Sequence, residues 1–298
     1  MNAVMMALVA NVGVAIAKFV AFLLTRSASM LAESIHSLAD TTNQLLLLLG
    51  KRHSKKKPNE EHQFGYGRAR YFYSFLVAIL LFAVGGVFSV YQSIQEIMHP
   101  SDLDSPIIAI VILIIGMILE GLALRTSIIE TKHIDKKFKY RNVLKFIEET
   151  KNSDLPVVLL EDTAALIGLS FAMAGVVASM ITKNPIYDAV GSGAIGILLL
   201  IVAVFLGSQM GSLLIGESAD DDTILTIENA VKESNVEIIH LRTDYLSPDQ
   251  LLITLKIAID GALSAKEIVD IINDIERAIR RGINVPSMIF VEPDIKLW

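Results

Sequence analysis

The sequence predicts an α-helical membrane protein in which six transmembrane helices precede a small soluble α+β domain. Three observations support this fold class. The 298 residues are 53% hydrophobic and only 19% charged, with a mean hydropathy of +0.54, which is unusual for a soluble protein. The apolar residues form long blocks, each able to supply the ~20 residues that cross a bilayer. After Gly216 these blocks end and short amphipathic elements begin.

Six apolar blocks predict the membrane helices, at roughly residues 3–25, 29–50, 71–97, 106–125, 155–182 and 186–215. The first block could be mistaken for a secretory signal. It is longer than the apolar region of such a signal, and it lacks a basic N-terminal region and an A-x-A cleavage pattern. Five further blocks also follow it. We therefore interpret it as a membrane helix and assign residues 1–215 to one membrane domain.

The loop charges indicate the orientation of these helices. The loops at 25–27, 99–104 and 183–185 carry few basic residues, whereas the two alternate loops are rich in them. Their basic residues are Lys51, Arg52, Lys55, Lys56, Lys57, Arg68 and Arg70 in one loop, and Lys132, Lys136, Lys137, Lys139, Arg141, Lys145 and Lys151 in the other. Because positive loops face the cytoplasm, we expect a multi-pass integral protein of the cell inner or plasma membrane with both termini cytoplasmic.

Residues 216–298 predict a soluble α-β-β-α-β domain with its helices on one face of a sheet. The predicted elements are a helix after the acidic residues 220–222, strands at 236–243 and 251–259, a helix after 264 and a strand at 288–291. Ser264 and Glu267 match a capping box, and Gly282 predicts a C-terminal cap for the second helix. The domain has 16 acidic and 8 basic side chains, and this charge of −8 argues against nucleic acid as a partner.

Polar side chains inside the apolar blocks are the best candidates for function. The chain has no cysteine, so any metal site would use nitrogen and oxygen ligands. His36 and Asp40 are four residues apart and therefore project from the same face of the second helix. A divalent cation would compensate both groups at bilayer depth. The alternative is that they only form hydrogen bonds with neighbouring helices.

A third candidate lies at the same depth on the fifth helix. Asp40 lies 11 residues before Lys51, and Asp162 lies 11 residues after Lys151. Both carboxylates are therefore ~16 Å deep in a ~30 Å hydrocarbon core, where they repel each other unless a cation or proton lies between them. With His36 they suit Zn²⁺, Mn²⁺, Fe²⁺ or Co²⁺. Glu161 points about 100° away from Asp162, so it is either a fourth ligand after local distortion or the partner of a basic residue.

The remaining intramembrane polar residues have structural interpretations. Lys18 is placed to neutralise Glu33 across the first helical hairpin. Asn43 and Gln44 are expected to donate hydrogen bonds between helices rather than to bind metal. Glu120 lies near the inner end of the fourth apolar block.

Two segments carry a resemblance to a known family. The segment from Ser27 to Asp40 (SASMLAESIHSLAD) resembles the second-helix signature of the cation diffusion facilitator family of metal/proton antiporters. The segment from His62 to Arg68 (HQFGYGR) resembles the loop that leads into the third helix of this family. The Glu-Asp pair in helix five is similar to that of the subgroup containing the mitochondrial zinc exporter. The resemblance covers nearly the whole chain.

This resemblance implies a proton-coupled efflux transporter for a divalent cation, with zinc as the leading candidate and manganese, iron or cobalt as alternatives. It implies alternating access, no prosthetic group, and a homodimer formed through a ferredoxin-like, metallochaperone-like C-terminal domain. The residues implied to bind metal are His36, Asp40 and Asp162. The histidine that helix five of the family usually carries is Val158 here, so the fourth ligand would be Glu161, a backbone carbonyl or water.

A further metal site in the loop before helix three is not carried over, because Tyr66 replaces its second histidine. Metal binding by the C-terminal domain stays open. The competing function is a non-transporting membrane metal sensor or scaffold, in which the intramembrane polar residues are structural and the acidic domain recruits a partner. We do not expect an enzyme, because the sequence has no HExxH pattern or similar nucleophile–base pairing.

Overall fold

The computed structural model describes residues 3–100, 105–134, 146–147 and 150–295. The chain forms two compact units. The first contains residues 1–52 and 70–211 and consists of long helices. The second contains residues 53–69 and 212–298 and holds the sheet. The loop at 53–69 therefore packs with the sheet, although it connects two membrane helices in the sequence.

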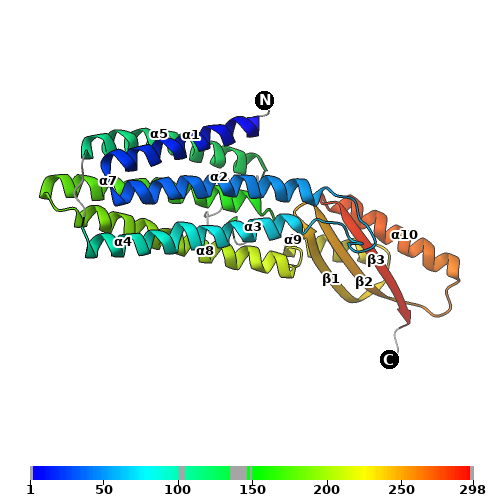
Figure 1. Ribbon diagram of the computed structural model, residues 1–298. Coiled ribbons are helices and arrows are strands. Elements are labelled where there is room, and N and C mark those ends of the chain that lie inside the picture. Colours follow the sequence, from blue (N-terminus) through cyan, green and yellow to red (C-terminus); the bar gives the residue numbers. More distant parts are fainter. Residues whose placement is uncertain (1–2, 101–104, 135–145, 148–149, 296–298) are drawn as a thin grey trace. The chain divides into compact units, whose positions relative to one another are not determined.

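The described residues of the first unit contain the six predicted helical segments, which Figure 1 shows side by side along a common direction. They are α1 (Ala3–Thr25), α2 (Ala28–Ser54), a third segment made of α3 (Ala69–Leu80), η1 (Leu81–Val87) and α4 (Phe88–Met98), then α5 (Pro106–Ile134), α7 (Asp154–Thr182) and α8 (Ile186–Ile215). η1 is a π-helical turn that the sequence pattern did not predict. Most of the second basic loop, 135–145, lies outside the described residues.

Four segments of the described chain are long and apolar enough to cross a membrane: Ala69–Met98, Pro106–His133, Asp154–Thr182 and Ile186–Ile215. The apolar stretch Val12–Thr25 of α1 is shorter. α2 is not among the four, because its inward face carries Glu33, His36 and Asp40. The helical membrane fold is therefore confirmed, and the count of six spans is supported in part.

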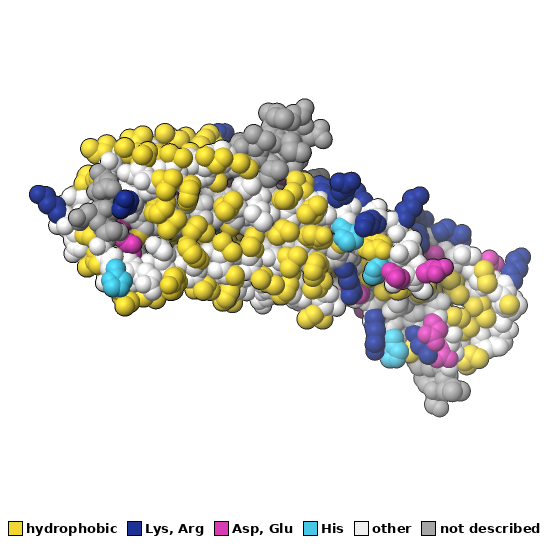
Figure 2. Space-filling model, in the orientation of Figure 1, with side chains coloured by type: hydrophobic (Ala, Val, Ile, Leu, Met, Phe, Trp, Pro, Cys, Tyr) yellow, Lys and Arg dark blue, Asp and Glu magenta, His cyan; other side chains and the backbone are white. Residues whose placement is uncertain are grey.

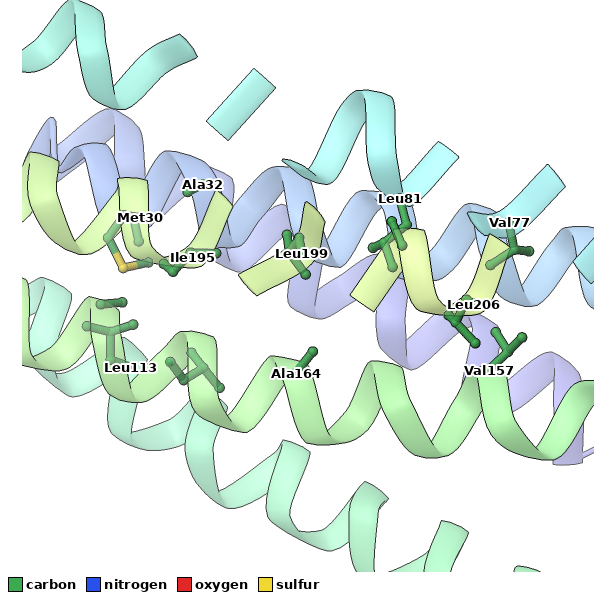
Figure 3. Close-up of a cluster of buried hydrophobic side chains, with 14 of the residues drawn as sticks. Met30, Ala32, Val77, Leu81, Leu113, Val157, Ala164, Ile195, Leu199 and Leu206 are labelled. Atoms are coloured by element: carbon green, nitrogen blue, oxygen red, sulfur yellow. The ribbon is translucent and has the colours of Figure 1, made fainter. Parts of the chain in front are cut away.

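The surface of the helical unit is apolar and its interior holds polar groups. Ile107, Ile181 and Ile201 are 70%, 72% and 63% exposed, whereas Lys18 and Glu33 are 2% and 0% exposed. Figure 2 shows hydrophobic side chains over most of the visible face of this unit and few charged side chains among them. Figure 3 shows part of the core, where side chains of α2, α3, η1, α5, α7 and α8 pack together. This distribution suits a surface that faces lipid.

Asp188 joins α8 to the N-terminus of α2. Its carboxylate accepts hydrogen bonds from the Ser27 hydroxyl at 2.8 Å and from the Ser29 amide at 3.3 Å. The Ser29 hydroxyl in turn donates to the Asp188 carbonyl at 2.8 Å. Gly191 permits this close approach, because a Cβ there would lie 3.0 Å from the Ser29 hydroxyl oxygen. Asp188 thus supplies the N-terminal cap of α2 from another helix.

The second unit has the predicted αββαβ order. Its elements are α9 (Asp221–Lys232), β1 (Glu237–Ser247), β2 (Gln250–Ile259), α10 (Ala265–Gly282) and β3 (Ser287–Ile295). The strand order is β1-β2-β3, with β2 antiparallel to β1 and parallel to β3. Alternate residues of β2, from Leu251 to Ile257, share one hydrophobic cluster with α9 and α10, so both helices cover the same sheet face. β3 is longer than predicted because it pairs with β2 along nearly its whole length.

The ends of α10 confirm one prediction and contradict another. The Ser264 amide donates to the Glu267 carboxylate at 2.7 Å, and the Glu267 amide donates to the Ser264 hydroxyl at 3.4 Å, which is the predicted capping box. These bonds from Ser264 lower the pKa of Glu267. The cap assigned to Gly282 was wrong, because Gly282 is the last helical residue and Ile283 caps the helix. The glycine serves packing instead: a Cβ there would lie 2.7 Å from the Thr226 methyl group of α9.

Replacement of Asp188 by alanine is expected to lower the thermal stability of the whole chain in detergent. The change removes the acceptor of the Ser27 hydroxyl and the Ser29 amide, and buried donors left without acceptors cost about 1–3 kcal/mol. The control is Ser170→Ala on α7, where an exposed hydroxyl bonds only to the carbonyl of Leu166 in its own helix. Equal melting temperatures for the two variants would contradict the capping role of Asp188.

Candidate metal site

α2 brings His36 and Asp40 one turn apart, as predicted. The distance between His36 Nδ1 and Asp40 Oδ1 is 3.6 Å, which is too long for a strong hydrogen bond. Both ring nitrogens of His36 and Oδ1 of Asp40 are buried without a hydrogen-bond partner among the described residues. Buried polar atoms of this kind usually have a partner, so their state indicates a ligand or a function. The interpretation that His36 only makes interhelical hydrogen bonds gains no support from these contacts.

A cavity of about 200 Å³ lies between α1, α2, α5 and α7. Its polar lining consists of Ser37, Asp40, Gln44, Glu120, Glu161 and Asp162. Four of these six side chains are carboxylates, and the lining contributed by the described residues contains no lysine or arginine. The volume is sufficient for an ion with several water molecules, because a water occupies about 30 Å³. Asp40 and Asp162, which the depth argument paired, therefore share one space.

The two adjacent acidic residues of α7 are held by different helices. Asp162 accepts a hydrogen bond from the Ser127 hydroxyl of α5. Glu161, which is 6% exposed, accepts one from the Asn43 amide of α2 at 2.5 Å. Asn43 is thus an interhelical donor, as predicted. Neither alternative for Glu161 matches the structure as stated: its hydrogen-bond partner is an amide and not a basic residue, and it lines the cavity without distortion of the helix.

The structure does not draw the candidate ligands into one coordination shell. Within the described ranges, no three His, Asp or Glu side chains converge closely enough to hold a metal ion. Asp40, Glu161 and Asp162 line the cavity, whereas His36 is not part of its lining. Metal binding by His36, Asp40, Asp162 and Glu161 would therefore require a rearrangement of side chains or helices.

A buried ion pair lies beside the cavity. The Lys18 ammonium is 3.1 Å from a Glu33 carboxylate oxygen, which confirms the predicted pairing of α1 with α2. It is also 3.9 Å from Glu120 of α5, a residue that sequence reasoning placed near the end of its helix. That placement was wrong, because α5 continues to Ile134. Glu120 lies 12 residues before Lys132, and this spacing could have indicated that its depth matches that of Asp40 and Asp162.

Tyr66 in the loop at 53–69 and His240 on β1 have ordinary environments in the second unit. Tyr66 packs between His53 and His62, at ring-centroid distances of 5.3 Å and 4.4 Å. Its hydroxyl accepts a hydrogen bond from the Asn59 amide at 3.0 Å. His240 lies exposed on β1, opposite Lys256. These contacts describe a packed tyrosine in place of the histidine that the family site would require.

Comparison with known proteins gives the family. Residues 4–215 match the cation efflux transmembrane domain, and residues 218–294 match the cytoplasmic domain of cation efflux proteins. The chain belongs to the cation diffusion facilitator, or cation efflux, family. This confirms the resemblance found in the sequence. Val158, the position where the resemblance implies a histidine, lines the cavity one turn before Asp162.

Several relatives of the chain are metal transport or metal tolerance proteins by name. The mitochondrial proton-coupled zinc antiporter SLC30A9 of Homo sapiens is 34% identical over 224 residues, which are 75% of this chain and 39% of that protein. Metal tolerance protein C4 of Arabidopsis thaliana is 28% identical over 248 residues, or 83% of this chain and 54% of that protein. The cation-efflux pump FieF of Pectobacterium atrosepticum is 27% identical over 259 residues, which are 86% of this chain and 80% of that protein. The chain thus spans about two fifths of the length of SLC30A9.

Replacement of Lys18 by methionine is expected to destabilise the helical unit strongly. It leaves the Glu33 carboxylate buried without its cation, and breaking one side of such a pair costs about 3–5 kcal/mol. Adding Glu33→Gln should recover most of the loss, since no uncompensated charge then remains. Thermal unfolding of the purified chain in detergent measures both effects. A single variant as stable as the double variant would contradict the pairing.

Proposed function

We propose that this family member exports a divalent metal cation in exchange for protons, with zinc as the first candidate. The observation that supports this best is the cavity among apolar helices that Asp40, Glu161 and Asp162 line together. Carboxylates in a poorly solvated space require a positive charge, and a divalent ion supplies it. The SLC30A9 relatives are named proton-coupled zinc antiporters, which agrees with this proposal.

In the proposed mechanism, Asp40 and Asp162 bind the cation first, because both line the cavity. His36 then joins through its unpartnered nitrogens, and Glu161 completes the set when it releases the Asn43 amide. Two carboxylates and one imidazole are suitable zinc ligands. Because each ligand binds metal only when deprotonated, loading the site releases protons, and reprotonation from the opposite side expels the ion. Rocking of the helices exposes the cavity to each side in turn.

The assembly that we propose is a homodimer in the membrane. The second unit matches the cytoplasmic domain of cation efflux proteins, and its pairing with a second copy would couple the two helical units. The positive loops support an orientation with both termini in the cytoplasm. We propose a cell inner or plasma membrane as the location and no catalytic role.

Asp40→Asn and Asp162→Asn are each expected to abolish uptake of Zn²⁺ into vesicles reconstituted with the purified chain. Each change keeps the side-chain shape and removes one of the negative charges that compensate the ion. The matched control is Leu38→Ala on α2, a side chain 58% exposed toward the surface of the unit, which should keep wild-type uptake. Normal metal binding with no transport by the wild type would favour the sensor or scaffold. Undiminished flux in both carboxylate variants would exclude these residues as ligands.

Val158→His is expected to raise the affinity for Zn²⁺ relative to Mn²⁺. The change places an imidazole at a cavity-lining position one turn from Asp162, and nitrogen ligands favour zinc over manganese. Isothermal titration of both ions on the purified chain measures the ratio. Val157→His, at the neighbouring buried position that does not line the cavity, is the control. An unchanged ratio in Val158→His would contradict the assignment of this cavity as the metal site.

A further inference from the structure

Lys18 connects a structural ion pair with the cavity. Its ammonium lies 3.1 Å from Glu33, which is 0% exposed, and 3.9 Å from Glu120, which lines the cavity. Lys18 itself is 2% exposed. One cation therefore lies between two carboxylates, of which only Glu120 also faces Asp40, Glu161 and Asp162 across the cavity.

The charges around Lys18 do not balance. One ammonium can neutralise one carboxylate, and Glu33 is the nearer of the two. Glu33 is 0% exposed, and its Oε1 has no hydrogen-bond partner among the described residues. Glu120 has more freedom, since its side chain is 19% exposed and holds Lys18 only at the longer distance. A second cation in the cavity would complete its compensation.

We propose that Glu120 is a further cation-binding carboxylate of this cavity, and that Lys18 is an internal counter-ion that competes with the transported cation for it. This inference rests on the proposed function. Glu120 provides a carboxylate oxygen in place of the donor atom that the site lacks because Val158 stands where the family has histidine. The Lys18 ammonium lies within reach of both carboxylates, and a divalent ion that binds Glu120 leaves Lys18 paired with Glu33 alone.

The inference gives opposite expectations for two changes at the same ion pair. Glu33→Gln removes the nearer partner of Lys18, so the ammonium should hold Glu120 more firmly and weaken metal binding. Lys18→Met combined with Glu33→Gln removes the competitor without changing the net charge, so metal binding should become tighter. If the ion pair were purely structural, the two variants would not change the metal affinity in opposite directions, and the changes would not both depend on Glu120.

The test is isothermal titration of Zn²⁺ into the purified full chain in detergent, after size-exclusion chromatography has checked the fold of each variant. Glu120→Gln is expected to weaken binding by at least about 10-fold, because loss of a residue that only supports metal ligands already costs about 10- to 100-fold. The matched control is Glu130→Gln, an exposed glutamate on the same helix, which should stay within about twofold of wild type. Lys18→Met with Glu33→Gln should tighten binding roughly fivefold or more, a typical coupling between sites.

The decisive measurement repeats each change in the Glu120→Gln background. Both the weakening by Glu33→Gln and the tightening by the double variant should disappear there. The inference is overturned if Glu120→Gln behaves as Glu130→Gln does, or if either effect persists without Glu120. If the double variant does not fold, the isosteric Glu33→Gln change decides alone: its effect on Zn²⁺ affinity is compared between the wild-type chain and the Glu120→Gln chain. Wild-type chain that binds no Zn²⁺ or Mn²⁺ would overturn the proposed function, whereas loss of binding in Asp40→Asn but not in Glu120→Gln would overturn only this inference.

Discussion

The helical unit depends on compensation of charges that are buried among apolar helices. An ionised side chain at this depth costs several kcal/mol unless a partner neutralises it. Lys18 and Glu33 meet this requirement by pairing across α1 and α2 at 3.1 Å. The same requirement turns the polar face of α2 inward and leaves large apolar side chains on the surface of the unit. The ion pair therefore sets which face of α2 the other helices cover.

The carboxylates around the cavity meet the requirement only in part. Asp162 and Glu161 accept hydrogen bonds from Ser127 and Asn43, and these neutral donors orient the carboxylates without cancelling their charge. Asp40 Oδ1 has no donor among the described residues. An incompletely compensated site can accept and release a mobile cation, whereas Glu33 has a covalently attached cation, Lys18, 3.1 Å away. This difference separates the transporting function that we propose from simple structural pairing.

Sequence reasoning succeeded where one local rule decided the outcome. Apolar block lengths located the helices, period-two alternation located β2, and the Ser264–Glu267 pattern located the start of α10. The equal sequence separations of Asp40 from Lys51 and of Asp162 from Lys151 predicted a common depth, and both residues line one cavity. The fourth block was cut at 125 because polar residues follow it, although the helix continues to Ile134. A glycine at the end of a periodic helical segment predicts a cap. The packing role of Gly282 depends on Thr226, which lies 56 positions away in the sequence, so no local pattern indicates it.

The fold class, the family and the helical faces that carry His36, Asp40 and Asp162 follow from the sequence, because spacing along one helix decides which side chains share a face. Which of these faces meet follows from the packing of the helices. This packing directs Glu161 to Asn43 and Asp162 to Ser127, and it brings Glu120 within reach of Lys18 and of the cavity. These contacts join residues from different helices, and their geometry depends on helix rotation and packing, which no local pattern records.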